Sequence, residues 1–122
     1  MLNVIAIFIG GGIGSVLRYF AGLLCGFKLH HMPFATLAVN MVACFIIGIC
    51  YAYFQSKTSI PPHIKLALTC GFCGGLSTLS ALALEVVLIQ ESFPITAIVY
   101  AILSVVLSVV AVLLGIGLGR MF

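Results

Sequence analysis

The chain contains four apolar runs, each about as long as a membrane-spanning helix, joined by short polar stretches. They cover residues 4–24, 34–54, 64–89 and 95–119, and about 20 apolar residues suffice to cross a bilayer. Charged residues make up only 6% of the chain, against about 25% in soluble domains, so they could not cover a water-facing surface. The sequence therefore predicts an all-α, multi-pass membrane protein, with residues 1–122 forming a single four-helix transmembrane domain.

The third run is interrupted near its middle, between Cys70 and Ser80. It holds three glycines within five residues, each of which costs a helix about 1 kcal/mol relative to alanine, and three hydroxyl side chains follow. Inside a bilayer a frayed backbone is tolerated only where protein or water covers it, so a helix broken here is typical of an ion or substrate site. The alternative is a tight packing point, because small residues let helices approach closely.

The second run carries only two polar side chains, Thr36 and Asn40, which stand four residues apart and therefore share one helix face. A primary amide in hydrocarbon is costly unless it is paired. Asn40 is expected either to hydrogen-bond a neighbouring helix or to donate its NH₂ group to an anion.

The fourth run carries a stripe of hydroxyls, with Tyr100, Ser104 and Ser108 at spacings of four residues along one helix face. Serine hydroxyls can bond back to the carbonyl four residues earlier, which would make the stripe inert. We favour the alternative, a path lined by hydroxyl groups, because the rest of this helix is almost entirely aliphatic.

The basic residues are divided almost evenly between the two ends of the expected bundle. Lys57, Lys65 and Arg120 fall on the side of the termini, and Lys28 and Arg18 on the other. Arg18 is either an interfacial anchor or a functional intramembrane cation. Because the bias is weak, the chain could insert either way up, and two copies, one inverted, would form an inverted repeat.

The polar groups inside the runs argue against an enzyme. The spans contain no paired carboxylates, no nucleophile–histidine–acid set and no metal cluster, and the acid nearest the membrane, Glu85, falls toward the end of its run. The embedded groups are neutral hydroxyls, one amide and Arg18, all of which donate hydrogen bonds. A narrow path lined in this way suits a small anion or water.

Three motifs together resemble the CrcB/Fluc fluoride channel family, and the likeness spans nearly the whole chain. They are residues 11–19 (GGIGSVLRY), 33–40 (PFATLAVN) and 71–80 (GFCGGLSTLS). The resemblance implies an antiparallel, dual-topology dimer in the cytoplasmic (inner) membrane, surrounded by lipid, with its third helix broken mid-membrane. It also implies passive export of fluoride and a structural Na⁺ ion at the dimer interface, held by the backbone carbonyls of Gly74 and Ser77.

The resemblance assigns further roles to single residues. Arg18 matches an arginine of the vestibule or dimer interface, and the expected fluoride pathway consists of Thr36, Asn40, Ser80, Tyr100, Ser104 and Ser108. The chain departs from the family at Leu79 and Leu82, where members carry two phenylalanines whose ring edges can face an anion. Further along the fourth helix, Val112 stands where another hydroxyl would extend the track.

The two leucines leave the type of assembly open. The chain is expected to form either a homodimer or a heterodimer with a paralogous subunit, in which it would conduct or serve as a non-conducting structural half. A small multidrug-resistance-type transporter is the alternative class. Such a transporter needs a buried glutamate in its first span, and residues 4–24 contain none.

Overall fold

The computed structural model describes residues 1–25, 28–29, 31–57 and 59–122. Four segments are long and apolar enough to cross a membrane: Leu2–Leu24, Phe34–Ser56, Pro62–Gln90 and Pro94–Gly119. The prediction of a helical chain with four candidate spans is therefore confirmed, with each span starting or ending within two residues of its expected bounds.

The four spans are built from seven helical segments, and a small hairpin joins the first two spans. The helices are α1 (Leu2–Leu24), α2 (Phe34–Ser56), α3 (Pro62–Leu66), the π-helix η1 (Ala67–Cys73), α4 (Gly74–Leu76), α5 (Leu79–Gln90) and α6 (Pro94–Gly119). Strands β1 (Lys28–Leu29) and β2 (Met32–Pro33) pair antiparallel between α1 and α2. Prolines begin α3 and α6, where a missing N–H costs nothing.

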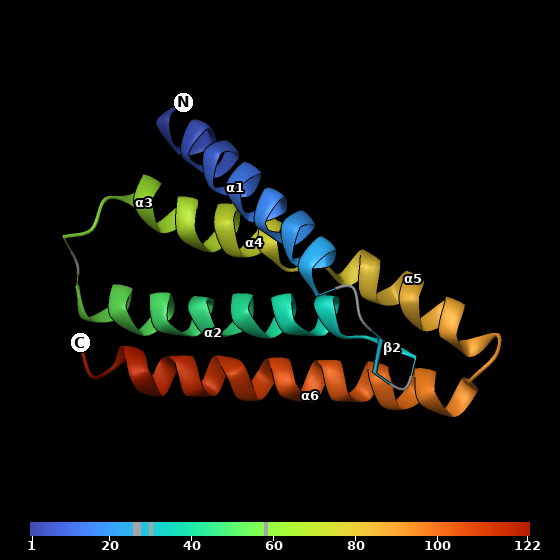
Figure 1. Ribbon diagram of the computed structural model, residues 1–122. Coiled ribbons are helices and arrows are strands. Elements are labelled where there is room, and N and C mark those ends of the chain that lie inside the picture. Colours follow the sequence, from blue (N-terminus) through green and yellow to red (C-terminus); the bar gives the residue numbers. More distant parts are fainter. Residues whose placement is uncertain (26–27, 30, 58) are drawn as a thin grey trace.

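Helices α2 and α6 lie side by side along their length, and α1 crosses over the α3–η1–α4 segment (Figure 1). Helix α5 continues beyond the break toward the other end of the molecule, where it packs on α6. Both termini lie at the same end of the bundle, as four crossings require (Figure 1).

Glycines make the two closest helix contacts. A methyl group added at Gly10 or Gly14 of α1 would overlap a backbone carbonyl of the α3–η1–α4 segment, and one added at Gly75 would overlap the carbonyl of Gly11. On the other pair, an added methyl at Gly48 or Gly115 would overlap the facing backbone of α6 or α2. These small residues thus let the helix backbones touch, as the packing interpretation of the glycines expects.

The third span is indeed interrupted, but the glycines do not form the break. Gly71 lies within η1 and Gly74 and Gly75 lie within α4, whereas Ser77 and Thr78 have extended backbone angles, with ψ of 153° and 114°. The expectation that the glycines themselves unwind the helix is wrong, because close packing against α1 holds two of them in helical conformation. The depth of the break within a bilayer stays a prediction.

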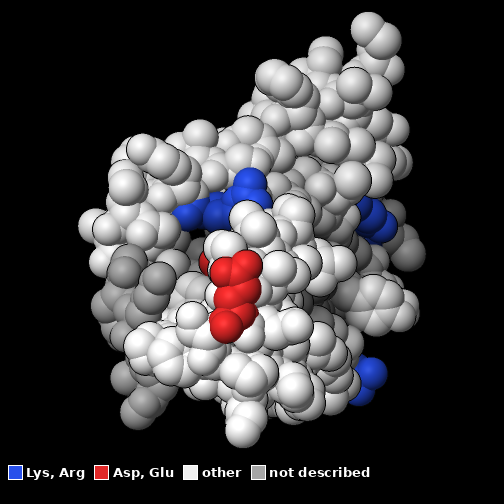
Figure 2. Space-filling model, turned by 90° about the vertical axis from the view of Figure 1, so that its right-hand side faces the viewer, with Lys and Arg blue, Asp and Glu red and all other residues white. Residues whose placement is uncertain are grey.

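The buried core is small, and large apolar side chains cover the outside of the molecule. One core cluster joins Leu37, Leu82 and Tyr100, and a second joins Val39, Ala43 and Leu76. On the face seen from the end where α5 gives way to α6, acidic atoms lie beside basic ones near the centre, further basic atoms lie at one edge, and uncharged residues cover most of the rest (Figure 2). Such an apolar exterior suits contact with lipid rather than water.

Candidate ion pathway

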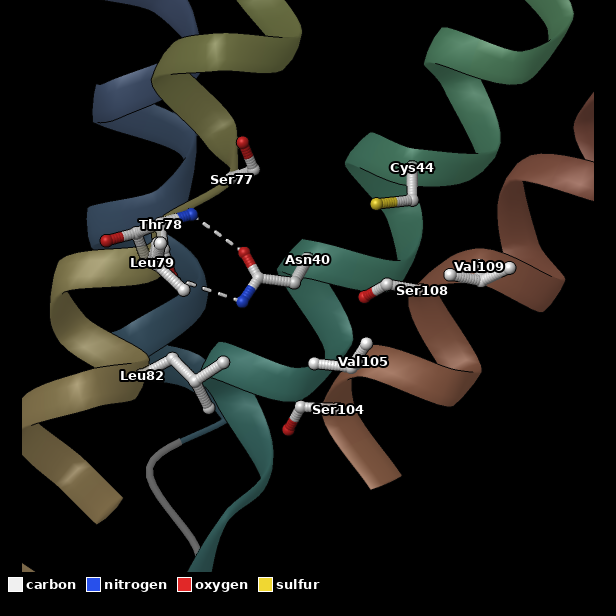
Figure 3. A pocket seen from close by; sticks show the side chains of 10 residues that line it. All are labelled: Asn40, Cys44, Ser77, Thr78, Leu79, Leu82, Ser104, Val105, Ser108 and Val109. Carbon is white, nitrogen blue, oxygen red and sulfur yellow. Dashed lines mark hydrogen bonds between the residues drawn. The ribbon is translucent and has the colours of Figure 1, made fainter. Parts of the chain in front are cut away.

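The break in the third span is held by the side chain of Asn40 on α2. The backbone N–H of Thr78 donates to Asn40 Oδ1 at 2.7 Å, and Asn40 Nδ2 donates to the Thr78 carbonyl at 3.3 Å (Figure 3). Both residues are buried. The amide thus satisfies both backbone groups of an extended residue that would otherwise be left unpaired in the apolar interior. Asn40 pairs with the third span, as one of its two expected roles requires.

Thr78 also begins the helix that follows the break. Its hydroxyl accepts a hydrogen bond from the backbone N–H of Ala81 at 3.2 Å, which is an N-cap interaction for α5. In a continuous helix the N–H groups of Thr78 and Ala81 would donate to the carbonyls of Gly74 and Ser77. Here both donors are diverted to side chains, which frees the carbonyls of Gly74 and Ser77, the two groups to which the family resemblance assigns Na⁺.

Gly74 and Ser77 line a small cavity of about 120 Å³ between α2 and the third span. Carbonyl oxygens released from helix bonding are hard ligands of the kind that alkali cations prefer. Within the described ranges, no group of three or more His, Cys, Asp or Glu residues could hold a metal ion. The free carbonyls of Gly74 and Ser77 therefore fit the sodium ion that the family resemblance implies.

A larger cavity, of about 270 Å³, lies between the break and helices α2 and α6 (Figure 3). Its polar members come from all three elements, and the Ser108 hydroxyl points toward Asn40 (Figure 3). One Nδ2 hydrogen of Asn40 is used by Thr78, so the other is available to this cavity. The lining residues are Asn40, Cys44, Ser77, Thr78, Leu79, Leu82, Ser104, Val105, Ser108 and Val109.

The leucines at the family's phenylalanine positions both line this cavity, but they are placed differently. Leu82 is buried, with 8% of its surface exposed, whereas Leu79 is 77% exposed. Figure 3 shows both on α5, across the cavity from the serines of α6. The α5 side of this cavity is therefore lined by aliphatic side chains.

The three hydroxyls of the α6 stripe share one face but make different contacts. Ser104 is buried and donates to the Tyr100 carbonyl at 2.7 Å, so its hydrogen is bonded back to its own helix. Ser108 is half-buried and has no hydrogen-bond partner among the described residues. The inert alternative thus describes Ser104, while Ser108 keeps its donor.

Thr36 and Tyr100 meet at a residue that the sequence interpretation left aside. Thr36 Oγ1 donates to Glu85 Oε1 at 2.6 Å, and the Tyr100 hydroxyl donates to Glu85 Oε2 at 2.7 Å. Tyr100 also lies 3.4 Å from the Pro33 carbonyl. The three side chains join α2, α5 and α6. The sequence held a signal for this cluster. Thr36 and Tyr100 lie near the starts of the second and fourth spans and Glu85 near the end of the third, so all three fall on the same side of the bundle. A lone acid in an apolar run also needs partners.

Two of the expected site residues lie apart from the cavity. Ser80 is exposed and does not line it, although its hydroxyl lies 3.3 Å from that of Thr78. Arg18 is half-buried on α1 and forms no hydrogen bond or ion pair with a described residue. The structure therefore brings Asn40, Ser104 and Ser108 to one cavity and Thr36 and Tyr100 to Glu85, but joins neither Ser80 nor Arg18 to them.

Comparison with known proteins gives one family over most of the chain. Residues 5–116 match the family model described as CrcB-like protein, Camphor Resistance. A protein of Serratia proteamaculans named fluoride-specific ion channel FluC is 43% identical over 114 residues, which cover 93% of this chain and 90% of the relative. A Yersinia pestis protein named fluoride-specific ion channel FluC 1 is 49% identical over 90 residues, covering 73% of this chain and 71% of the relative.

Proposed function

This chain belongs to the CrcB-like family, and on that premise we propose that it forms a fluoride-specific channel through which the ion leaves the cytoplasm passively. The relatives named fluoride-specific ion channel support this proposal. The observation that carries it in the structure is the cavity at the break, where Asn40 and Ser108 keep hydrogen-bond donors within an otherwise apolar bundle.

The physical argument rests on the cost of moving a small anion into an apolar environment. An unpaired ion loses tens of kcal/mol of hydration, so the path must supply donors continuously. The Asn40 amide and the Ser108 hydroxyl can replace water around a fluoride ion in the cavity. Ser104 would contribute only after its present hydrogen bond rearranges, and Ser80 only after its side chain turns into the cavity.

We further propose that two copies or two paralogous chains assemble antiparallel across the break. Leu79 is 77% exposed although it lines the cavity, and Gly74 is also exposed, so this side of the bundle is open to a partner. In such a dimer the free carbonyls of Gly74 and Ser77 from opposed chains would meet. A sodium ion would supply the positive charge that these oxygens need, and Arg18 would lie at the vestibule or interface.

The aliphatic wall favours a second arrangement in which this chain needs a paralogue. Leu79 and Leu82 offer no ring edge to an anion, so a partner with phenylalanines could supply the better pore while this chain completes the structure. Neither the relatives nor the site favours a multidrug-resistance-type transporter. In either assembly we place the protein in the cytoplasmic (inner) membrane, where it would lower intracellular fluoride.

Fluoride efflux from liposomes tests the proposal directly. Vesicles loaded with potassium fluoride and containing the purified chain should release fluoride to an external electrode, and chloride-loaded vesicles should not release chloride. Efflux only after addition of a phenylalanine-bearing paralogue would assign the chain to a heterodimer. Absence of efflux with and without the paralogue, from protein that is folded and reconstituted, would contradict channel function.

Asn40→Asp is the sharpest variant for the same assay. Aspartate keeps an oxygen that can accept from the Thr78 N–H, but it has no N–H for an anion and brings a like charge. We expect efflux to fall by at least about tenfold, which corresponds to the loss of one hydrogen bond to a charged group. Unchanged efflux would remove Asn40 from the path.

A further inference from the structure

The carboxylate of Glu85 already holds two hydroxyl donors of the expected fluoride pathway. Thr36 donates to one of its oxygens at 2.6 Å and Tyr100 donates to the other at 2.7 Å. Tyr100 has no exposed surface and Thr36 is 9% exposed, so neither hydroxyl can turn to bulk water instead. Each carboxylate oxygen therefore has its own buried O–H donor.

These contacts have the geometry of anion recognition. Hydrogen bonds from a hydroxyl to a charged oxygen are short, at about 2.5–2.7 Å, and roughly twice as strong as neutral ones. An anion that entered at this level would need the same two hydrogens. The carboxylate is thus an anion tethered to α5 that occupies the place a diffusing anion would take.

We propose that Glu85 is a specificity-determining residue that acts as a tethered competitor, so that only an ion able to displace its carboxylate from Thr36 and Tyr100 can pass. The proposal rests on the channel function proposed above and extends its path from Asn40 and Ser108 to Thr36 and Tyr100. Fluoride is small and a strong hydrogen-bond acceptor, so it can replace a carboxylate oxygen at a hydroxyl. Chloride is larger and a weaker acceptor, and it would leave both hydroxyls on Glu85. Selectivity then has two sources: the hydroxyls attract the anion, and Glu85 competes for the same hydroxyls against any anion that accepts hydrogen bonds weakly.

The surroundings of Glu85 support a replaceable partner rather than a fixed ion pair. The carboxylate forms no ion pair with a described residue, and its hydrogen-bond partners in the described part of the chain are the two neutral hydroxyls. Helix α5, which carries it, is separated from α4 by the extended residues Ser77 and Thr78. Glu85 is only half-buried, although both of its donors are buried. The carboxylate can therefore move away from the hydroxyls more easily than they can move from it.

Glu85→Ala and Glu85→Gln test the proposal in the liposome assay, with Glu91→Gln as the matched control. Glu91 is the other acidic residue of the chain, and it lies exposed in the turn before α6. Removal of the competitor should lower the fluoride concentration for half-maximal efflux by about tenfold in Glu85→Ala. The ratio of chloride to fluoride efflux should rise. Glu85→Gln should be intermediate, because its amide oxygen can still accept from one hydroxyl, and Glu91→Gln should behave as the unmodified protein.

A purely structural role for Glu85 gives different results. If the carboxylate only clamps α5 to α2 and α6, both variants should unfold at lower temperature, and fluoride and chloride efflux should fall together with the half-maximal concentration unchanged. That outcome in folded protein overturns the proposal. Loss of fluoride efflux in the unmodified protein, by contrast, would refute the channel function on which the proposal rests.

Infrared difference spectroscopy keeps the proposal testable even if the Glu85 variants do not fold. In the Glu91→Gln protein, Glu85 is the only remaining side-chain carboxylate, so its stretching bands can be separated from those of the chain terminus. Fluoride at concentrations that saturate efflux should shift these bands, because the carboxylate loses two strong hydrogen bonds, and chloride should not. Bands that do not respond to fluoride would refute displacement.

Discussion

The side-chain amide of Asn40 pairs with both backbone groups of Thr78, at 2.7 Å and 3.3 Å, and in this way replaces the helix bonds that the third span lacks at its break. The consequence extends to the neighbouring residues. Because the Thr78 N–H is engaged by Asn40, the Gly74 carbonyl loses its helical donor, and because the Thr78 hydroxyl caps α5, the Ser77 carbonyl loses its own. The Asn40 amide thus connects the larger cavity, which it lines, to the free carbonyls of Gly74 and Ser77.

Asn40→Ala should therefore affect both stability and conduction. It removes a buried donor and acceptor while leaving both backbone groups of Thr78 unpaired, which costs about 1–3 kcal/mol. We expect a lower thermal unfolding temperature in detergent together with loss of fluoride efflux. Unchanged unfolding would show that Thr78 finds other partners when Asn40 is absent.

The two serines of α6 should respond differently to alanine substitution. Ser104 bonds back to the Tyr100 carbonyl, whereas Ser108 keeps its hydroxyl for the cavity. Ser108→Ala should lower fluoride efflux severalfold, in line with a lost hydrogen bond of about 0.5–1.5 kcal/mol. Ser104→Ala should change it by less than about twofold, because this hydroxyl is already satisfied. Equal effects would show that Ser104 turns to the ion during passage.

The glycine contact between α1 and the third span predicts a stability difference between two substitutions on α1. A methyl group at Gly14 would overlap the backbone at Phe72, whereas one at Gly12 meets nothing within 4 Å. Gly14→Ala should destabilise the protein by about 1–3 kcal/mol through overpacking. Gly12→Ala should be neutral or stabilising, by up to about 1 kcal/mol from helix propensity. Unfolding in detergent measures both, and equal stability of the two variants would contradict the close approach of these helices.

Residue spacing was sufficient to predict the four spans and the shared face of Thr36 and Asn40. It also predicted an interruption of the third span between Cys70 and Ser80, although not that Ser77 and Thr78 rather than the glycines would form it. Local patterns could not predict which residues meet across helices. Gly71 and Gly75 carry a helix penalty, yet both stay helical because contact with α1 outweighs that penalty. The partners of Glu85 lie 49 and 15 residues away in the chain, so no local pattern could reveal them.

The roles of the serines likewise could not be predicted from local sequence patterns. The spacing places Ser104 and Ser108 on one face of α6. Only the packed structure shows that the Ser104 hydroxyl is already hydrogen-bonded, whereas that of Ser108 has no partner among the described residues. The hydroxyl of Ser80, next to the break in sequence, lies outside the cavity because α5 begins at Leu79 and turns that side chain outward.

Phenylalanine at the two leucine positions should separate the effect of the pore wall from that of packing. Leu79 is 77% exposed, so Leu79→Phe should be accommodated with little change in unfolding temperature. Leu82 belongs to the core cluster with Leu37 and Tyr100, so Leu82→Phe should destabilise the chain by about 1–3 kcal/mol unless the new ring enters the cavity.

If an aromatic edge assists the anion, fluoride efflux should increase in Leu79→Phe and increase further when both positions are changed, because each ring turns a positive edge toward the path. Leu79→Met is the control, since it adds a flexible apolar side chain with no ring edge, and it should leave efflux unchanged. An equal increase in Leu79→Met would attribute the effect to side-chain volume. Efflux that remains low in the double variant would show that the aliphatic wall is not what limits conduction in this chain.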